Sequence, residues 1–461
     1  MKNISLEFEQ ALRDLVRDRM SCHQGLLDQH GKDESFHTPH SPDVVVFPVS
    51  NEEVSQIVQL CARTGTSLVP FGAGTSLEGH IAAVKGGVCL DMSQMNKILE
   101  INASDLDCRV QAGVTRKQLN ASLKPYGQFF AVDPGADATL GGMTSTRASG
   151  TNAVRYGTMK DNVLGLTVIM PDGEIIRTGS RARKSAAGYD LTRLLCGAEG
   201  TLGVITEVQL RCFGLPEAHA VGVCSFTGVE TAVQTVIEVI QHGVPVARVE
   251  LLDGLQMRAI NAYSKLDYAE QPTLFFEFHG TDASVVEQSQ RVAELVLSNG
   301  GSDLQWAVDQ ETQNKLWQAR HDAYYAARAL RPGTSGWPTD VCVPISRLAD
   351  CIIETQADLK EFDLLAPIVG HVGDGNFHLL LLVDEHAPGE LAIAQQVNDR
   401  LIKRALRMGG TSTGEHGIGY GKLPYMQLEH GAALDVMRMI KKALDPLNIM
   451  NPGKVIPDIG G

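Results

Sequence analysis

The chain has 461 residues, more than one hydrophobic core usually supports, so we expect two or more domains. Its composition is that of an ordinary globular protein, and a formal net charge of −14 argues against nucleic-acid binding, which requires a basic face. Nine cysteines are scattered without a C-x-x-C pair, which indicates reduced thiols of the cytosolic type without a catalytic or metal role.

The N-terminal stretch MKNISLEFEQALRDLVRDRM is amphipathic and lacks the apolar core of a secretory signal. An arginine-containing start of this kind can be a transit peptide, but Glu7, Glu9, Asp14 and Asp18 argue against that interpretation. The densest apolar run, HLLLLV, is too short to span a membrane. We therefore expect a soluble cytoplasmic protein, associated at most peripherally with the inner face of the membrane.

Residues 43–215 alternate short apolar runs, typical of strands, with turns and a few helices. The longer helix is predicted at 50–65, where Ser50 is a cap and Gly65 follows the last turn. A shorter helix is predicted at 115–127.

The pattern changes at Pro216, where we place a domain boundary. Two strand–helix–strand units follow, at 220–253 and 274–309, and predict an antiparallel sheet backed by helices. One helix is then predicted at 311–330, with Arg320 and Tyr324 four residues apart on one face. Arg320 can clamp a carboxylate, or it can be an ordinary surface arginine.

The first glycine-rich loop, PFGAGTSLEGH at 70–80, follows an apolar strand and suggests a dinucleotide fingerprint. That motif must open a long crossover helix, whereas the next strand, VCLDM, begins here after a few residues. Two interpretations stay open, a loop whose N–H groups cradle a pyrophosphate and a plain surface turn. The segment 133–162, rich in glycine, threonine and serine, is too long for a simple loop and favours a binding stretch over a disordered loop.

Two histidines flank a tight turn in GHVGDGNFH at 370–378. Gly373 and Gly375 on either side of Asp374 are turn formers, so the stretch predicts a hairpin that folds His371 and His378 toward each other. Such a pair can share a metal ion or be hydrogen-bonded in a core.

Glu415 and His416 are adjacent in GEHG, so their side chains face different directions on most backbones. One can join a metal site while the other points at a substrate. Together with the hairpin, this stretch suggests a His-His-Glu metal triad plus a spare base, although a surface turn remains the alternative.

Six ordered stretches from about residue 40 to the C-terminus carry a resemblance to a known family. They are PFGAGTSLEGH, the segment from DPGADATLGGM to EIIRTG, GAEGTLGVIT, HVGDGNFH, GEHGIGYGK and NPGKVIP. They resemble the flavin-binding family of vanillyl-alcohol oxidase type, and more narrowly its D-2-hydroxy-acid dehydrogenase branch. Residues 317–348 look most like the cytochrome-linked D-lactate dehydrogenases of that branch.

The resemblance implies an α+β fold, with an FAD-binding domain of two small subdomains and an α+β cap domain that contains an antiparallel sheet. Accordingly, we expect a helical segment at 1–35, the FAD-binding domain at 36–215 and the substrate or cap domain at 216–410. The segment 411–461 would return to the flavin site.

The family's FAD-binding positions map onto four stretches of this sequence. Non-covalent FAD is expected, because Thr75 stands where members with covalent flavin carry a histidine. The positions implied to bind FAD are Gly72, Gly74, Thr75 and Ser76 at the pyrophosphate; Pro134, Gly135, Thr139, Gly142, Ser145, Asn152 and Tyr156 in the second stretch; Gly200 and Ile205 at the adenosine end; and Asn451 at the flavin ring.

The activity implied by the resemblance is oxidation of a D-2-hydroxy acid, with D-lactate to pyruvate as the first choice and hydride transfer to FAD N5. A divalent metal, Zn or Mn, held by His371, His378 and Glu415 would lower the pKa of the substrate hydroxyl. His416 would act as general base, and Arg320 would pair with the substrate carboxylate.

Substrate size and electron acceptor rest on fewer residues. Tyr324 and Trp337 would complete the substrate site. Trp337 as a wall of that site favours a substrate with a small side chain over D-2-hydroxyglutarate. The distal carboxylate of D-2-hydroxyglutarate needs a second cation, for which Arg331 is available. A glycolate oxidase flavin subunit, a non-redox flavin subunit and a flavin-free zinc hydrolase are the other interpretations. Electrons would pass to a cytochrome or quinone, and a homodimer is one open assembly.

Overall fold

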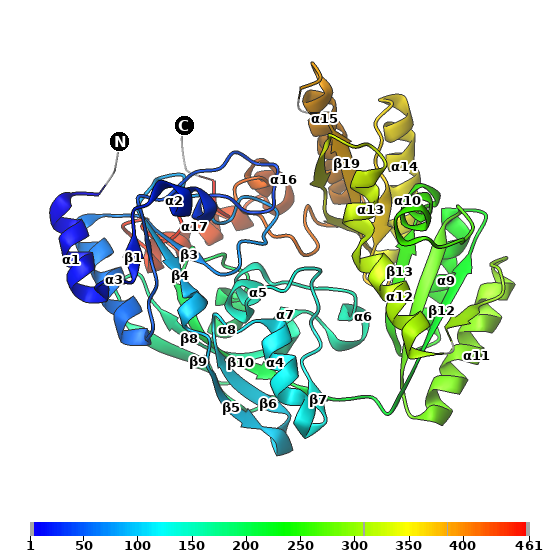
Figure 1. The fold of residues 1–461 in the computed structure, drawn as a ribbon, viewed down its shortest axis with the longest axis horizontal. Helices are drawn as coiled ribbons and strands as arrows, with labels where there is room; N and C mark the ends of the chain where they lie inside the picture. Colours follow the sequence, from blue (N-terminus) through cyan, green and yellow to red (C-terminus); the bar gives the residue numbers. More distant parts are fainter. Residues whose placement is uncertain (1–3, 308, 385, 458–461) are drawn as a thin grey trace. The chain divides into compact units, whose positions relative to one another are not determined.

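The computed structural model describes residues 4–307, 309–384 and 386–457 (Figure 1). Contacts between residues divide the chain into two compact units, each described separately below. The first unit contains residues 1–149, 157–215 and 415–461, and the second contains residues 150–156 and 216–414. Assigning FAD binding to one unit and substrate binding to the other remains a prediction.

A small, mainly parallel sheet forms one part of the first unit. Its strands follow the order β1-β2-β4-β3, with β2 and β3 both parallel to β4. The bounds are β1 Met20–Ser21, β2 Val44–Val46, β3 Leu68–Phe71 and β4 Val88–Asp91. No helix lies between β3 and β4, where every residue is described, so the loop after β3 does not open a dinucleotide-binding crossover helix.

An antiparallel sheet of five strands forms the other part of this unit, in the order β5-β6-β10-β8-β9. Its strands are β5 Ile98–Asn102, β6 Asp107–Gln111, β8 Val163–Ile169, β9 Ile175–Gly179 and β10 Val204–Arg211. A two-stranded ribbon of β7 Gln128–Phe129 and β11 Phe213–Gly214 completes the strands described in this unit.

The helices of the first unit include both helices predicted for residues 43–215. In α3, Ser50 Oγ accepts a hydrogen bond from Glu53 N at 3.2 Å, and Gly65 has the left-handed conformation with φ +67. The helices are α1 Leu6–Val16, α2 Gln24–His30, α3 Asn51–Thr64, α4 Arg116–Leu123, α5 Leu140–Thr146, α7 Met159–Asn162, α8 Leu191–Leu195, α16 Met426–His430 and α17 Ala433–Leu444.

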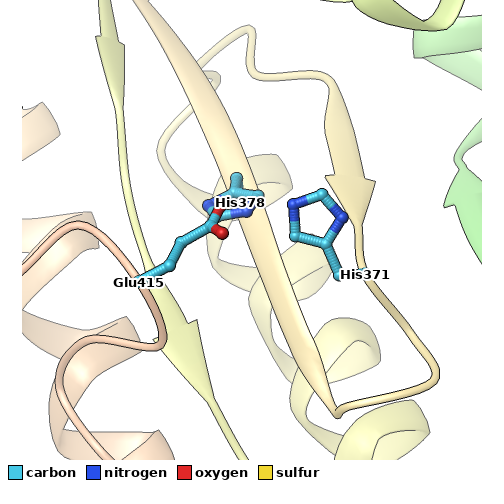
Figure 2. Close-up of side chains that lie close together, drawn as sticks. All are labelled: His371, His378 and Glu415. Carbon is cyan, nitrogen blue, oxygen red and sulfur yellow. The ribbon is translucent and has the colours of Figure 1, made fainter. Parts of the chain in front are cut away.

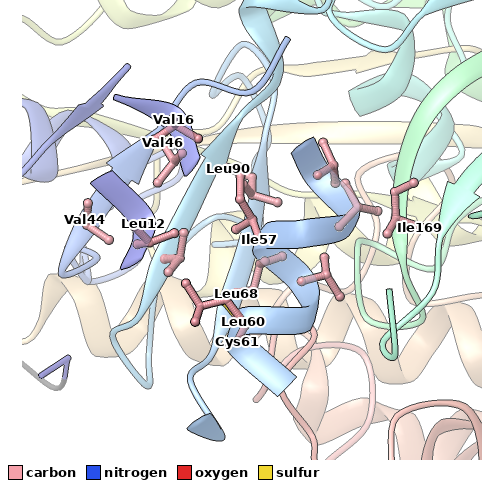
Figure 3. Packing of buried hydrophobic residues seen from close by; sticks show 14 of the residues in the cluster. Leu12, Val16, Val44, Val46, Ile57, Leu60, Cys61, Leu68, Leu90 and Ile169 are labelled. Carbon is pink, nitrogen blue, oxygen red and sulfur yellow. The ribbon is translucent and has the colours of Figure 1, made fainter. Parts of the chain in front are cut away.

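The core around the small sheet joins residues from both ends of the chain. Apolar side chains of α1 and α3 pack on the sheet, as Leu12, Ile57 and Leu90 illustrate in Figure 3. Ile449 and Met450 belong to the same buried cluster, and Leu68 N donates a hydrogen bond to Ile449 O at 2.8 Å. The C-terminal segment is therefore part of the core of the first unit.

The second unit is built on an eight-stranded antiparallel sheet in the order β15-β12-β14-β13-β18-β19-β16, with β17 also paired to β19. Its strands are β12 Ala218–Ser225, β13 Val246–Leu252, β14 Thr273–Gly280, β15 Gln305–Ala307, β16 Ser335–Pro338, β17 Val341–Cys342, β18 Ile368–Gly370 and β19 Asn376–Val383. The predicted antiparallel sheet is confirmed. The last predicted strand, 303–309, includes Val308, which lies outside the described residues.

Helices pack against this sheet in two groups. One group consists of α9, α11, α14 and α15, of which α11 packs on β12 and β14 and α15 on β19. The other consists of α10, α12 and α13, of which α10 packs on β13. The bounds are α6 Ala153–Tyr156, α9 Val229–Gln241, α10 Gly254–Ser264, α11 Asp282–Ser298, α12 Gln310–His321, α13 Ala323–Ala329, α14 Leu348–Glu361 and α15 Glu390–Arg407.

The single helix predicted at 311–330 is wrong, because α12 and α13 are separated at Asp322. The backbone of Asp322 has φ −78 and ψ 1, and its side chain accepts a hydrogen bond from Gln318 Nε2 at 2.9 Å. Aspartate is a weak helix former because its side chain competes for local hydrogen bonds. Arg320 and Tyr324 are therefore not neighbours on one continuous helix.

Candidate functional site

The hairpin predicted at GHVGDGNFH is present in the second unit. Strands β18 and β19 are antiparallel, with Val369 opposite His378, and Asp374 N donates to His371 O at 3.1 Å within the turn. The ring centroids of His371 and His378 lie 5.4 Å apart, with the rings nearly perpendicular. The turn thus places two imidazoles side by side.

Glu415 completes a group of three possible ligands with these histidines. It is bonded directly to Gly414, the last residue of the second unit. One ligand atom from each of His371, His378 and Glu415 lies within 4.8 Å of the other two (Figure 2). Two imidazoles and a carboxylate suit Zn, Mn, Co or Fe, so the residues present fit a divalent metal, while their role as ligands remains a prediction.

Each histidine of the group has its Nδ1 atom directed at an acceptor. His371 Nδ1 lies 2.7 Å from Glu250 Oε1, and His378 Nδ1 lies 3.0 Å from the carbonyl oxygen of Thr339. These acceptors place the imidazole proton on Nδ1 of each ring, so that the lone pair is on Nε2. Such outer hydrogen bonds are typical of metal-ligating histidines.

Arg320, the predicted carboxylate clamp, is buried in the last turn of α12. Its Nε and Nη2 atoms donate to Glu250 Oε2 at 2.9 and 2.5 Å. Burial alone would raise the pKa of Glu250, but its interactions with His371 and Arg320 outweigh burial and hold that pKa below its usual range. One ionised carboxylate therefore contacts both side chains.

The other two predicted substrate residues lie near the same sheet of the second unit. Trp337 is buried in β16, opposite Leu381 of β19. Tyr324 is half-buried in α13, and its hydroxyl donates to Gly336 O at 3.5 Å. Tyr324 is thus next to the strand that carries Trp337, and the substrate roles of both residues remain predictions.

In the first unit, the loop after β3 lies against the start of α5, which brings two of the predicted FAD-binding stretches together. Thr139 caps α5, and its Oγ1 accepts from Gly142 N at 3.3 Å. A Cβ atom on Gly72 would lie 2.4 Å from Thr139 Oγ1, so only glycine allows this approach. Pro134, Gly135 and Ser145 flank or belong to α5, and Gly74, Thr75 and Ser76 continue the loop.

Asn451 joins the predicted stretches at the base of the same loop. Its Nδ2 atom donates to His80 O at 3.0 Å and to Glu199 O at 2.7 Å. Among the residues that the structure describes, the buried atoms Asn451 Oδ1 and His80 Nδ1 have no hydrogen-bond partner. A bound polar ring with donors and acceptors would satisfy such atoms, so this part of the unit fits a flavin.

Gly200 and Ile205 follow Glu199 closely in the sequence, but the contacts they make are with other residues of the protein fold. Ile205 is buried in the core beneath the five-stranded sheet. Gly200 has φ +72, and a Cβ atom on it would lie 3.0 Å from the ring of Pro70. Ile205 therefore packs in the core and Gly200 allows a close approach to Pro70, and their assignment to the adenosine end remains a prediction.

Asn152 and Tyr156 differ from the other predicted FAD residues because they belong to the second unit. Asn152 Oδ1 accepts from Arg248 Nε at 2.9 Å, and the Tyr156 hydroxyl lies 2.8 Å from His279 Nδ1. The predicted second FAD stretch therefore crosses from one unit to the other.

Sequence reasoning did not identify Glu250, Asp340 or Glu199. Asp340 is fully buried and accepts hydrogen bonds from Asn376 Nδ2 at 2.7 Å and Thr413 Oγ1 at 2.6 Å. Glu199 accepts from Ile418 N and Gly419 N at 2.7 and 2.8 Å. The sequence pattern that could have identified Glu250 is its carboxylate inside the predicted apolar strand PVARVELLD. A charge buried in this way requires partners.

The loop that carries Glu415 and His416 is held by a close approach at Gly417. This glycine has φ +84, and a Cβ atom on it would lie 2.6 Å from His80 Nε2 and 2.7 Å from Glu199 Oε1. We expect Gly417→Ala to displace the loop and to lower the melting temperature clearly. The affinity of the chain for Zn²⁺ should fall about tenfold or more.

The matched control is Gly431→Ala in the same unit. Gly431 also has a positive φ of +53, but a Cβ atom there would have nothing within 4 Å. It should cost only the backbone strain of an unfavourable positive-φ conformation, about 1–3 kcal/mol, and leave Zn²⁺ binding unchanged. Equal losses in both variants, by differential scanning fluorimetry and Zn²⁺ titration, would show that crowding at Gly417 has no role.

Comparison with known protein families gives two matches that cover most of the chain. Residues 42–179 match the model described as "FAD binding domain", and residues 215–455 match "FAD linked oxidases, C-terminal domain". The first match contains the loop after β3 and α5, and the second contains His371, His378 and Glu415.

Two curated relatives are similar over most of their length. A Danio rerio protein named "Probable D-lactate dehydrogenase, mitochondrial" is 51% identical over 95% of this chain and 89% of its own. An Arabidopsis thaliana protein named "D-lactate dehydrogenase [cytochrome], mitochondrial" is 46% identical over 99% of this chain and 81% of its own.

A solved structure of alkyldihydroxyacetonephosphate synthase has the same fold. It superposes with a TM-score of 0.78 at 20% identity and covers 98% of this chain and 87% of that chain. At this identity the likeness concerns the fold alone, and it confirms the predicted α+β architecture.

The expectation of a cytoplasmic protein is wrong, since both curated relatives are named as mitochondrial proteins. The acidic residues of the N-terminal segment were the argument against import. In the structure α1 packs Phe8, Leu12 and Val16 into the core, so its composition reflects folding rather than targeting. Every helix among the described residues is too short or too polar to cross a bilayer.

Proposed function

The chain belongs to the family of FAD-linked oxidases, and from this membership we propose that it is an FAD-dependent dehydrogenase of D-2-hydroxy acids. D-lactate is the proposed substrate and a cytochrome the proposed electron acceptor, as in the name of the relative that is 46% identical. The observation that carries the proposal is the His371, His378 and Glu415 group in a chain of this family.

FAD would be held non-covalently by the glycine-lined loop after β3, the start of α5, and Asn451. The approach of Gly72 to Thr139 and the buried Asn451 Oδ1 atom support this assignment. When bound, FAD supplies a two-electron acceptor for the hydride that leaves the substrate.

A divalent metal would be held through Nε2 of His371, Nε2 of His378 and the Glu415 carboxylate. When bound, it supplies a Lewis acid that favours ionisation of a hydroxyl group. The hydrogen bonds of the two Nδ1 atoms orient the rings before the metal arrives, which reduces the ordering required on binding.

His416 is proposed as the general base that accepts the hydroxyl proton of the substrate. Its neighbour Glu415 is the proposed ligand, so the chain places a base next to the metal group in sequence. Arg320 is proposed to bind the substrate carboxylate, which would fix the orientation of the reacting carbon. Trp337, buried in β16, supports a small side chain on the substrate.

The test is anaerobic mixing of the purified holoprotein with D-lactate, L-lactate and D-2-hydroxyglutarate, followed by flavin absorbance. We expect D-lactate to bleach the flavin fastest and L-lactate to leave it oxidised. Faster bleaching by D-2-hydroxyglutarate would reassign the substrate. A colourless protein, or one that none of these acids reduces, would contradict the proposed function.

A further inference from the structure

We propose that Glu250 is a positioning residue, which orients the metal ligand His371 and the carboxylate-binding Arg320 through one buried carboxylate. This inference rests on the proposed function, because it assigns a role relative to the proposed metal and substrate groups. It adds a residue that contacts His371 and Arg320 rather than the metal or the substrate.

Strand register places Glu250 at this position. In the β13–β18 pair, Leu251 lies opposite Gly370 and Leu252 opposite Val369. Continuing this antiparallel register by one residue places Glu250 opposite His371, at the point where β18 ends and the hairpin turn begins. The backbone of a central strand therefore holds the carboxylate behind the imidazole.

The Glu250 side chain is completely buried, with no exposed surface, so water cannot replace its partners. Its two oxygens are divided between them. Oε1 accepts a hydrogen bond from His371 Nδ1 at 2.7 Å. Oε2 accepts hydrogen bonds from Arg320 Nε at 2.9 Å and Nη2 at 2.5 Å. Each partner therefore depends on a different oxygen of the same rigid group.

This division has a chemical consequence for both partners. A carboxylate only accepts, so it keeps the His371 proton on Nδ1 and leaves the Nε2 lone pair for a metal. The same carboxylate fixes the plane of the Arg320 guanidinium, which sets the direction of its remaining N–H groups. A change at Glu250 must then affect metal binding and substrate binding together.

A second buried cluster on the neighbouring strand provides a matched control. Glu277 of β14 accepts from Arg248 Nη1 at 3.1 Å and lies 2.5 Å from His279 Nε2. It therefore repeats the glutamate–arginine–histidine pairing in the same sheet. His279 is not part of the group of possible metal ligands.

The decisive variant is Glu250→Gln, which keeps the shape but replaces one acceptor by an NH₂ donor. If the NH₂ group faces His371, Nδ1 of the ring must accept its hydrogen bond and the ring proton must move to Nε2. If the NH₂ group faces Arg320 instead, it opposes the N–H donors of the guanidinium. We expect Zn²⁺ affinity of the metal-free holoprotein to fall about 10- to 100-fold, and KM for D-lactate to rise. Glu277→Gln should leave Zn²⁺ affinity unchanged.

The double variant E250Q/R320Q tests the tautomer directly. The amide introduced in place of the Arg320 guanidinium has an oxygen that can accept a hydrogen bond. The amide introduced in place of the Glu250 carboxylate can therefore donate to it and turn its own oxygen toward His371. Zn²⁺ affinity should then return to within a few-fold of the native value while KM for D-lactate stays high. This variant also carries the test if Glu250→Gln does not fold.

The outcomes separate this inference from the proposed function. Native Zn²⁺ affinity in E250Q, or an equal loss in E277Q, would overturn the positioning role. Failure of the double variant to recover Zn²⁺ affinity would do the same. If the native protein binds no Zn²⁺, or if His378→Ala does not weaken its binding, the metal assignment fails first.

Discussion

Replacing His416 by asparagine is expected to lower the rate constant for anaerobic FAD reduction by D-lactate about 10²- to 10⁴-fold. Asparagine is similar in size but cannot accept the hydroxyl proton as a base. FAD should stay bound at native stoichiometry, because the proposed FAD residues lie in other stretches of the chain. Stopped-flow absorbance of the flavin provides the rate, and the spectrum of the purified variant provides the FAD content.

His430→Asn is the control for the loss of a histidine from the same unit. His430 ends α16 and has no role in the proposed mechanism. It should reduce FAD at the native rate. If the His416 variant also reduces FAD at the native rate, the base is another group, and Glu415 becomes the candidate to test next.

Removal of a metal ligand is expected to have an effect of similar size. His378→Ala leaves two of the three possible ligands, so Zn or Mn content should fall below stoichiometry. Loss of a Lewis acid is worth several kcal/mol of transition-state stabilisation, which corresponds to roughly 10³-fold in rate. Elemental analysis and stopped-flow reduction of the same preparation measure both quantities.

His386→Ala is the matched control, because His386 is an exposed histidine of the same unit. It should retain metal and activity. Treating the native protein with a chelator should abolish FAD reduction, and adding the metal back should restore it. Full activity in a preparation that elemental analysis finds free of divalent metal would refute the metal role.

The parts of the site that depend on local sequence were predictable. The Gly-Asp-Gly turn between two apolar runs determines a hairpin, and the hairpin determines that His371 and His378 are neighbours. Ser50 and Gly65 likewise mark both ends of α3. In each case a few adjacent residues contain all the information that the structure uses.

The parts that depend on contacts distant in the sequence were not predictable in this way. Glu250 is far from both His371 and Arg320 along the chain, and only the strand register brings them together. The break at Asp322 was missed for the opposite reason, because the helical pattern on both sides of it is strong. A single weak helix former such as Asp322 inside a strong helical pattern does not by itself show that the helix ends there.

The discontinuous first unit has a consequence for biosynthesis. Residues 216–414 of the second unit are translated before any residue of the C-terminal segment. The hydrogen bonds between Leu68 and the backbone of Ile449 and Asn451 can form only after these late residues have been synthesised. On the ribosome, part of the apolar surface of α1, α3 and the small sheet therefore stays exposed until the C-terminal segment has been made. This is the stage of synthesis at which a chaperone would protect the nascent chain.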